Sequence, residues 1–425
     1  MLSTLRNAWR TPDLRKKILY TLFFILIYRI GNHILVPGVD NKALENIANS
    51  GTLLGFYDLI SGGAFSKFNI FAMGVIPYIN ASIVIQLLTI AIPYLEQLSK
   101  EGEDGRKKIQ NYTRYAAVGF AVLQSFTTYV LIANQHALKD SSKLSVFLIM
   151  LTVSTASIFL MWLGDQITVK GIGNGISLLV FINIISRLPL QIYQVAGLQK
   201  AEEINVVQVI MFIAVIAVLL IAVIIMSLAE RRIPVQYAGK TVGNKSFKGQ
   251  STHIPINMNS TGVIAIIFAT SVMQFPATIA QFWPNSKVFN TIVNGAYSPF
   301  KSNTWVYAVV FFVLIIFFSW FYAQVTFKPD EMSENMHKSS GFIPGIRPGD
   351  YTAKYIEKVL TKVAIIGGAF AAIIAVFPVI LQGYTKFQGV QFGGTSLLIM
   401  VGVALDTMRQ IESNLVMRHY QGFLK

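Results

Sequence analysis

The sequence predicts an all-α polytopic membrane protein with ten transmembrane helices, and three observations lead to this fold class. Hydrophobic residues make up 53% of the 425 positions and charged residues only 13%, whereas charged residues reach about 25% in soluble domains. Ten windows are apolar over roughly the 20 residues that a helix needs to cross a bilayer. Lysine and arginine are far more frequent in every second loop between these windows.

The ten windows are separated by loops of unequal length. Most of the 35 lysines and arginines fall in loops on the side of both termini, so the positive-inside rule places both termini in the cytoplasm. The net charge of +15 then reflects topology, and nucleic-acid binding loses its main support. No small-residue cleavage pattern follows the first apolar run, which predicts a retained helix rather than a signal peptide. The windows lie at 18–36, 70–92, 114–134, 144–164, 174–193, 205–228, 259–281, 304–326, 361–381 and 394–411.

Ten spans divide into two groups of five, and an odd number per group forces the second group into the inverted orientation. The second half contains two long cytoplasmic loops rich in glycine, proline and basic residues, which predict ordered projections. The expected organisation is a cytoplasmic tail at 1–17, an N-terminal half at 18–193, an external hinge linker at 194–204, a C-terminal half at 205–411 with loops at 229–258 and 327–360, and a cytoplasmic tail at 412–425.

One predicted span, Phe71 to Leu88, contains Asn80, Ser82 and Gln86 among its aliphatic residues, and it follows a glycine-broken segment at 51–68 that is too interrupted to cross a bilayer. Polar atoms are costly in hydrocarbon, so they are expected to face other helices or a water-filled cavity. Ordinary helix packing and an aliphatic-lined pore both explain this mixture. Three further spans share the mixture, at 171–185, 260–279 and 392–408, whereas 205–228 and 304–326 are nearly pure hydrocarbon and are expected to face lipid.

Motifs of enzymes and metal sites are weak or missing in the sequence. Cysteine is absent, and the five histidines are widely separated. The AGKT at 238–241 lacks the upstream glycine and strand of a phosphate-binding loop, and the GIGNG at 171–175 lacks the strand of a dinucleotide loop. Arg29 and Asp406 lie inside predicted spans, where a structural role is favoured over an ion relay. We therefore expect no catalytic residues, no metal and no cofactor.

Eight segments, in order, resemble the SecY family of protein-conducting channels over nearly the whole chain: GVIPYINASIVIQLL, EGEDGRKKIQNYTRY, GIGNGIS, RRIPVQYA, QSTHIPINMN, FPATIA, GFIPGIRPG and FGGTSLLI. The resemblance implies two inverted five-helix halves around a central hourglass pore, which a re-entrant plug helix closes from outside. Irregular backbone is tolerated at that depth because it lines an aqueous cavity.

The resemblance also implies roles for individual residues. The pore ring maps onto Ile79, Ile83, Val180, Ile267 and Ile399. The plug, within about 51–68, comprises Tyr57, Asp58, Leu59, Ile60, Ser61, Gly62, Gly63, Ala64 and Phe65. A lateral gate lies between the spans at 70–92 and 114–134 and those at 259–281 and 304–326, with a polar seam of Thr89, Gln124, Asn174, Thr270 and Ser271.

The cytoplasmic loops resemble the family's docking sites for the SecA motor and the ribosome. The docking residues implied are Arg231, Arg232, Lys245, Lys248 and Arg347. Relatives often carry an arginine pair at the tip of the first loop, where this chain has Asn244 and Lys245, and this departure weakens the case for contact with ribosomal RNA there.

The function implied is a passive channel of the bacterial plasma membrane. It would move unfolded secretory polypeptides and release membrane segments sideways into lipid, with SecA or the ribosome as the driver. Implied partners are SecE and SecG subunits, signal peptides, translocating polypeptides and membrane lipids. Two alternatives stay open on the residues alone: an inverted-repeat transporter with a polar solute site at the midplane, and a membrane scaffold that conducts nothing.

Overall fold

Helices dominate the structure, a computed structural model. The described residues are 2–40, 67–134, 138, 142–200, 205–237, 241–242, 245–246, 251–259, 262–280, 291–293, 295, 298–301, 304–384 and 394–422. The predicted plug residues, at 57–65, lie outside this part of the chain.

Each predicted window is occupied by a helix of the described chain. In the first half the described helices are α1 (Leu2–Arg10), α2 (Pro12–Gly31), α5 (Ile76–Ala91), α6 (Pro93–Lys100), α7 (Glu103–Asn134), α8 (Lys143–Lys170) and α9 (Gly175–Lys200). In the second half they are α10 (Val206–Leu228), α11 (Gly262–Ala280), α13 (Trp305–Phe327), α14 (Pro329–Lys338), α15 (Asp350–Tyr384) and α16 (Gly394–Gly422). The windows account for all of these helices except α1, α6 and α14. Because α9 runs to Lys200, it extends well into the predicted linker at 194–204.

Six helical segments of the described residues are long and apolar enough to cross a membrane, and α5 with α6 makes a seventh if the pair is one span. These two helices meet at an angle of 99°. Ile92 between them is extended and precedes Pro93, and a residue before proline is sterically driven out of the helical region. The other three windows hold α2 and α16, which carry charged residues, and the shorter apolar α11.

The two spans of nearly pure hydrocarbon have different surroundings. Only 6% of the most apolar window of α10 is buried, as expected for a helix that faces lipid. The corresponding share for α13 is 33%, because α13 packs against both α11 and α15. Composition alone does not separate the two cases, since lipid tails are as apolar as leucine side chains.

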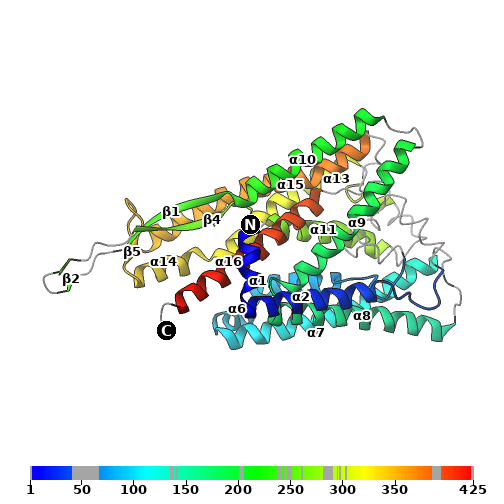
Figure 1. Ribbon diagram of the computed structural model, residues 1–425, viewed down its shortest axis with the longest axis horizontal. Helices are drawn as coiled ribbons and strands as arrows, with labels where there is room; N and C mark the ends of the chain where they lie inside the picture. Colours follow the sequence, from blue (N-terminus) through cyan, green and yellow to red (C-terminus); the bar gives the residue numbers. More distant parts are fainter. Residues whose placement is uncertain are drawn as a thin grey trace.

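The two long loops of the second half fold together at one end of the molecule (Figure 1). Strands β1 (Glu230–Tyr237) and β4 (Ser251–Asn257) form an antiparallel hairpin with β2 (Thr241–Val242) and β3 (Lys245–Ser246) near its tip. From the second loop, β5 (Gly341–Phe342) pairs with the other edge of β1, which gives the order β4-β1-β5. Strands in loops of an otherwise α-helical protein were not part of the predicted fold class.

An apolar core holds these loops as one unit, which we call the loop module (230–257 and 329–363, described residues). Alternate residues of β1, Ile233 and Val235, are buried, as expected for a strand with one covered face. They pack with Met336 of α14, Ile343 and the first turns of α15, including Ile356. The sequence predicted two ordered projections, and the structure joins them through this shared core.

Candidate pore and lateral gate

One apolar cluster contains aliphatic residues from α5, α9 and α16, together with residues of α2 and α8 and the rings of Phe24, Tyr28 and Phe71. Val180 and Ile399 are buried in it, and Ile79 packs against it. Three of the five predicted ring residues therefore meet in one cluster. Ile83 and Ile267 are half-buried and belong to none of the core clusters of the described residues. A cluster of flexible aliphatic side chains offers no fixed hydrogen bonds to anything that passes it.

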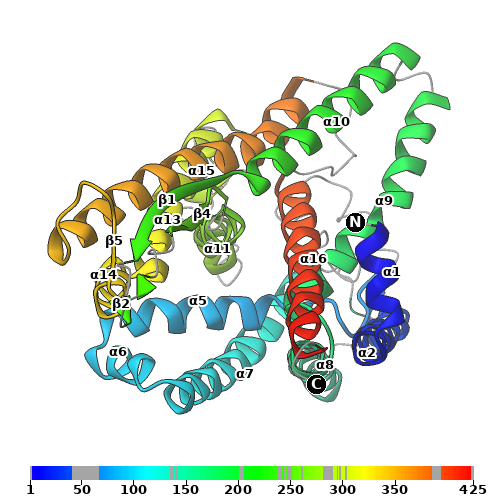
Figure 2. The same ribbon diagram turned by 60° about the vertical axis from the view of Figure 1, so that its left-hand side comes forward.

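A polar contact joins the two halves beside this cluster. The Ser271 hydroxyl on α11 donates a hydrogen bond to the Asn80 side-chain oxygen on α5, over 3.2 Å. In Figure 2, α11 lies above α5 and is seen nearly along its axis. Ser271 was among the predicted gate residues. Asn80 was missed in that set, although a signal was present, since it interrupts an aliphatic helix with an amide that hydrocarbon would not tolerate.

Three of the other predicted gate residues, Thr89, Thr270 and Asn174, form hydrogen bonds within or at the start of their own helices. The hydroxyls of Thr89 and Thr270 donate to carbonyl oxygens one turn earlier, Ile85 O at 2.8 Å and Ile266 O at 2.7 Å. Asn174 caps α9, because its side-chain oxygen accepts from the Ser177 backbone N–H at 3.1 Å. Gln124 is half-buried on α7. The described contacts thus place Ser271 in the seam and give Asn174 a local capping role.

The irregular segment before α5 is tied into the first half. The side-chain amide of Asn69 donates to the Asn32 carbonyl oxygen at 2.7 Å, and its oxygen accepts from the Phe71 N–H at 3.0 Å. Ser157 of α8 donates to the Gly74 carbonyl oxygen at 2.9 Å. Non-helical backbone is tolerated at membrane depth only where such partners are available. This segment therefore fixes where α5 begins.

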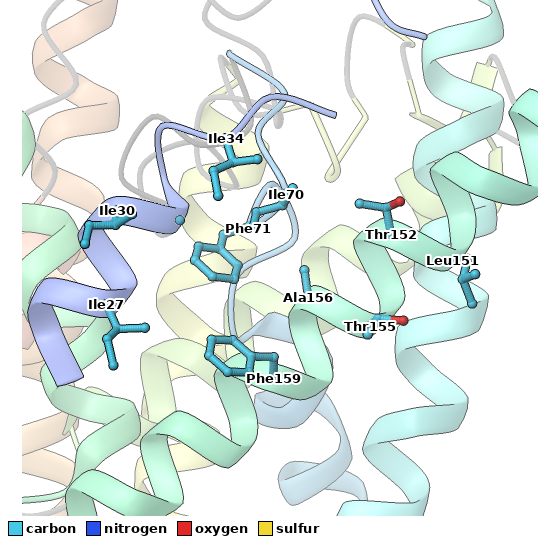
Figure 3. A pocket seen from close by; sticks show the side chains of 11 residues that line it. Ile27, Ile30, Ile34, Ile70, Phe71, Leu151, Thr152, Thr155, Ala156 and Phe159 are labelled. Atoms are coloured by element: carbon cyan, nitrogen blue, oxygen red, sulfur yellow. The ribbon is translucent and has the colours of Figure 1, made fainter. Parts of the chain in front are cut away.

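An apolar groove of about 590 Å³ lies between α2, α8 and the segment before α5 (Figure 3). The rings of Phe71 and Phe159 stack at its floor, with centroids 6.2 Å apart. The hydroxyls of Thr152 and Thr155 are the only side-chain polar groups among its lining residues. It does not have the converging polar groups of the solute site that the transporter alternative requires.

Comparison with known proteins gives the family. The SecY family model matches residues 69–408. The protein translocase subunit SecY of Streptomyces galbus is 42% identical, and the alignment covers 100% of both chains. The SecY subunit of Thermotoga maritima is 40% identical over 100% of this chain and 98% of its own length. The chain belongs to the SecY family.

Solved structures agree with the SecY fold. A structure described as that of a protein-conducting channel has a TM-score of 0.67 at 17% identity, covering 94% of this chain and 92% of its own. Sec61 in a canine ribosome–channel complex has a TM-score of 0.63 at 16% identity, with the same coverage. The family confirms the predicted fold class and the predicted function, a protein-conducting channel of the Sec type.

The basic residues that SecY resemblance assigns to docking lie on the loop module where they are described. Arg231 and Arg232 are exposed on β1, and Arg232 forms an ion pair of 2.6 Å with Glu230. Arg347 is exposed in the turn before α15, where its carbonyl oxygen accepts from the Thr352 hydroxyl at 2.9 Å. Lys245 lies on β3, and Lys248 lies outside the described residues.

The two charges inside predicted spans have different environments. The guanidinium of Arg29 lies 3.4 Å from the Ile182 carbonyl oxygen of α9, a contact within the first half. Asp406 is exposed on α16. This geometry agrees with the structural role that was favoured for Arg29.

Proposed function

We propose that this chain forms the pore through which unfolded polypeptides cross the bacterial plasma membrane, and that it opens sideways between α5 and α11. The observation that carries the proposal is the Ser271–Asn80 hydrogen bond between the two halves. Interhelical polar contacts in membranes are worth only about 0.6–2 kcal/mol each. A hydrophobic signal helix that enters between α5 and α11 can therefore replace this contact.

The aliphatic cluster of Ile79, Val180 and Ile399 supports a central seal. In the proposal Ile83, one turn after Ile79, and Ile267 complete the ring when a polypeptide occupies the pore. Aliphatic constrictions exclude water without binding a specific side chain. This property suits a channel that passes every amino acid. The plug is proposed at residues 57–65, outside the described part of the chain.

The proposed driver is SecA or the ribosome acting on the loop module. Strand β1 follows α10, β4 precedes α11 in sequence, and the second loop joins α13 to α15; in the proposal, a force on the module is transmitted to the gate helix α11. The canine ribosome–channel complex that contains Sec61, which shares the fold, supports the ribosome as a partner. SecE and SecG subunits are proposed as further partners. The excess of lysine and arginine on the module side supports cytoplasmic termini.

The absence of cysteine provides a direct test of the pore. A single cysteine at Ile83 is combined with a secretory precursor that carries one cysteine in its mature part and is arrested during export. A disulfide that forms only with SecA and ATP is the expected result. The matched control is a cysteine at Ile213, 60% exposed on the lipid-facing α10. The same experiment is repeated with a single cysteine at each of the other four ring positions. If the precursor crosslinks to the cysteine at Ile213 but to none at the five ring positions, the proposed path through the ring is wrong.

A further inference from the structure

The turn between α8 and α9, residues 171–175, contacts both α2 and α16. The Ile172 N–H donates to the Thr21 hydroxyl of α2 at 3.0 Å. The next N–H, of Gly173, donates to the side-chain oxygen of Gln410 on α16 at 2.8 Å. The GIGNG sequence of this turn, which fits no nucleotide loop, therefore serves as a contact between the first half and the last helix.

Glycine at 173 makes this contact possible. Its φ is +85°, a conformation that side chains with a Cβ rarely adopt. A Cβ at this position would also lie 3.3 Å from the Thr407 hydroxyl oxygen of α16 and 3.2 Å from Leu178 Cδ1. The turn therefore packs closely against α16, and a side chain at position 173 would require Thr407 or Leu178 to shift.

Apolar packing strengthens the same junction. Ile172 of the turn and Ile411 of α16 are each 5% exposed, and both belong to one cluster with Ala8 of α1 and Leu14 of α2. Residues 410 and 411 of α16 therefore both contact the first half, one through a hydrogen bond and the other through buried surface.

The residue before Gln410 contacts the other half. The guanidinium of Arg409 donates to the Ser227 carbonyl oxygen in the last turn of α10, at 3.3 Å. The Ser227 hydroxyl in turn accepts from the Asn259 amide, just before α11, at 3.1 Å. Successive residues of a helix point about 100° apart, so Arg409 and Gln410 can reach opposite sides of α16.

We propose that Arg409, Gln410 and the 171–175 turn form a pivot that keeps the two halves joined while they separate at Asn80 and Ser271. The pivot rests on the proposed function, because it describes how the lateral gate would open. The pivot contacts join α16 to the turn before α9, whereas the contact that breaks when the gate opens joins α5 to α11.

Two engineered disulfide locks distinguish a pivot, which stays in contact during opening, from an interface that separates. Ile172→Cys with Ile411→Cys places the lock within the buried junction, and Asn80→Cys with Ser271→Cys places it across the gate. Each protein is compared with its own reduced form in vesicles driven by SecA and ATP. We expect export through the oxidised junction lock to stay within about twofold of the reduced form, and export through the oxidised gate lock to fall at least tenfold.

The outcomes distinguish the pivot from the gate. Equal loss of export in both oxidised proteins would overturn the pivot and leave the gate intact. Full export through the oxidised gate lock would overturn the gate, and the pivot with it. Unsubstituted protein that folds but exports nothing in the same vesicles would contradict the proposed channel itself.

A second measurement tests Gln410 as a positioning residue. Gln410→Ala removes the acceptor for the Gly173 N–H, and we expect a several-fold increase in ion leak through the resting channel. Gln410→Glu keeps an oxygen at this position and is expected to restore the seal. The control is Asn414→Ala, one turn further along α16, because Asn414 is half-buried and its side-chain amide donates to the Gln410 backbone oxygen of that same helix. Equal leak in Gln410→Ala and Asn414→Ala would overturn the assignment.

Discussion

Ser271 on α11 and Asn80 on α5 lie on opposite halves of the molecule, 191 positions apart in sequence, and their side chains meet at 3.2 Å. Substituting Ser271 by alanine removes the donor but keeps the small side chain. We expect the closed state to lose about 0.6–2 kcal/mol, the range of such contacts in membranes. Precursors with defective signal sequences should then be exported more efficiently, by several-fold.

Thr270 provides the matched control for this prediction. Its hydroxyl donates within its own helix, to the Ile266 carbonyl oxygen, so Thr270→Val removes a hydroxyl without touching the seam. Export of a signal-defective precursor, relative to the intact precursor, is the measurement. Equal relaxation by Thr270→Val and Ser271→Ala would show that the gate does not depend on the Ser271–Asn80 contact.

The sequence could indicate that α5 needs a polar neighbour, but it could not name the partner. Asn80 and Ser271 were both visible as polar residues in apolar helices. Which of the polar residues meet depends on how two halves pack, and helix rotation in a membrane is not set by composition because lipid and protein are equally apolar. For the same reason Asn174, placed in the gate by resemblance, caps α9 in the structure.

The loop module shows a different limit of sequence reasoning. Glycine, proline and charge in the loops at 229–258 and 327–360 predicted ordered structure. The pairing of Gln236 with Phe342, which joins the loops, spans more than 100 residues and involves a strand of only two residues. So short a strand carries no periodicity of its own, and its position follows from the shared core of Ile233, Ile343 and Ile356.

Gly31 allows the segment before α5 to pack against α2. A Cβ at Gly31 would lie 2.1 Å from the Phe71 ring, and Phe71 is held between Tyr28 and Phe159. Gly31→Ala is expected to destabilise the protein by about 1–3 kcal/mol through overpacking. Thermal unfolding in detergent measures the effect.

Gly119 on α7 is the control for this substitution, because a Cβ there would have open space. Gly119→Ala should leave the melting temperature unchanged or raise it slightly, since alanine favours a helix over glycine. If the Gly31→Ala and Gly119→Ala proteins have the same melting temperature, the Phe71 ring can move aside to accept a Cβ at position 31.

An exposed ion pair on α6 gives a prediction for pH. Glu96 and Lys100 are 2.7 Å apart, and the hydrogen bond and charge of Lys100 lower the pKa of Glu96 below its ordinary 4.5. Any stabilisation from a carboxylate with a lowered pKa is complete above the ordinary value and is lost as the pH falls through the lowered one. Lys100→Ala should therefore raise the pKa of Glu96 back toward 4.5, as measured by carboxyl NMR titration.

The same protein contains an internal reference for that titration. Glu334 and Lys338 on α14 form an equivalent pair four residues apart, at 2.8 Å, and Lys338 lowers the pKa of Glu334 in the same way. Lys100→Ala should leave the Glu334 titration unchanged. A Glu96 titration that also stays unchanged would contradict the ion pair in solution.

Arg347 is the basic residue of the loop module whose role in motor docking can be tested with least structural disturbance. It is exposed, and the hydrogen bond at this residue uses its backbone oxygen, which Arg347→Glu retains. Reversing the charge should weaken docking of an acidic surface and lower SecA-driven export about tenfold or more, because a like-charge contact replaces an attractive one. If long-range steering contributes, the loss should be larger at low salt and smaller at high salt, because salt screens both the original attraction and the new repulsion.

The matched control for Arg347→Glu is Lys143→Glu, an exposed charge reversal at the start of α8. The positive-inside rule places this residue on the opposite side of the membrane from the loop module. Its export rate should equal that of the unmodified channel. If Arg347→Glu also exports at that rate while SecA binds with unchanged affinity, Arg347 does not dock the motor, and the module would have to act through Arg231 and Arg232 on the neighbouring strand.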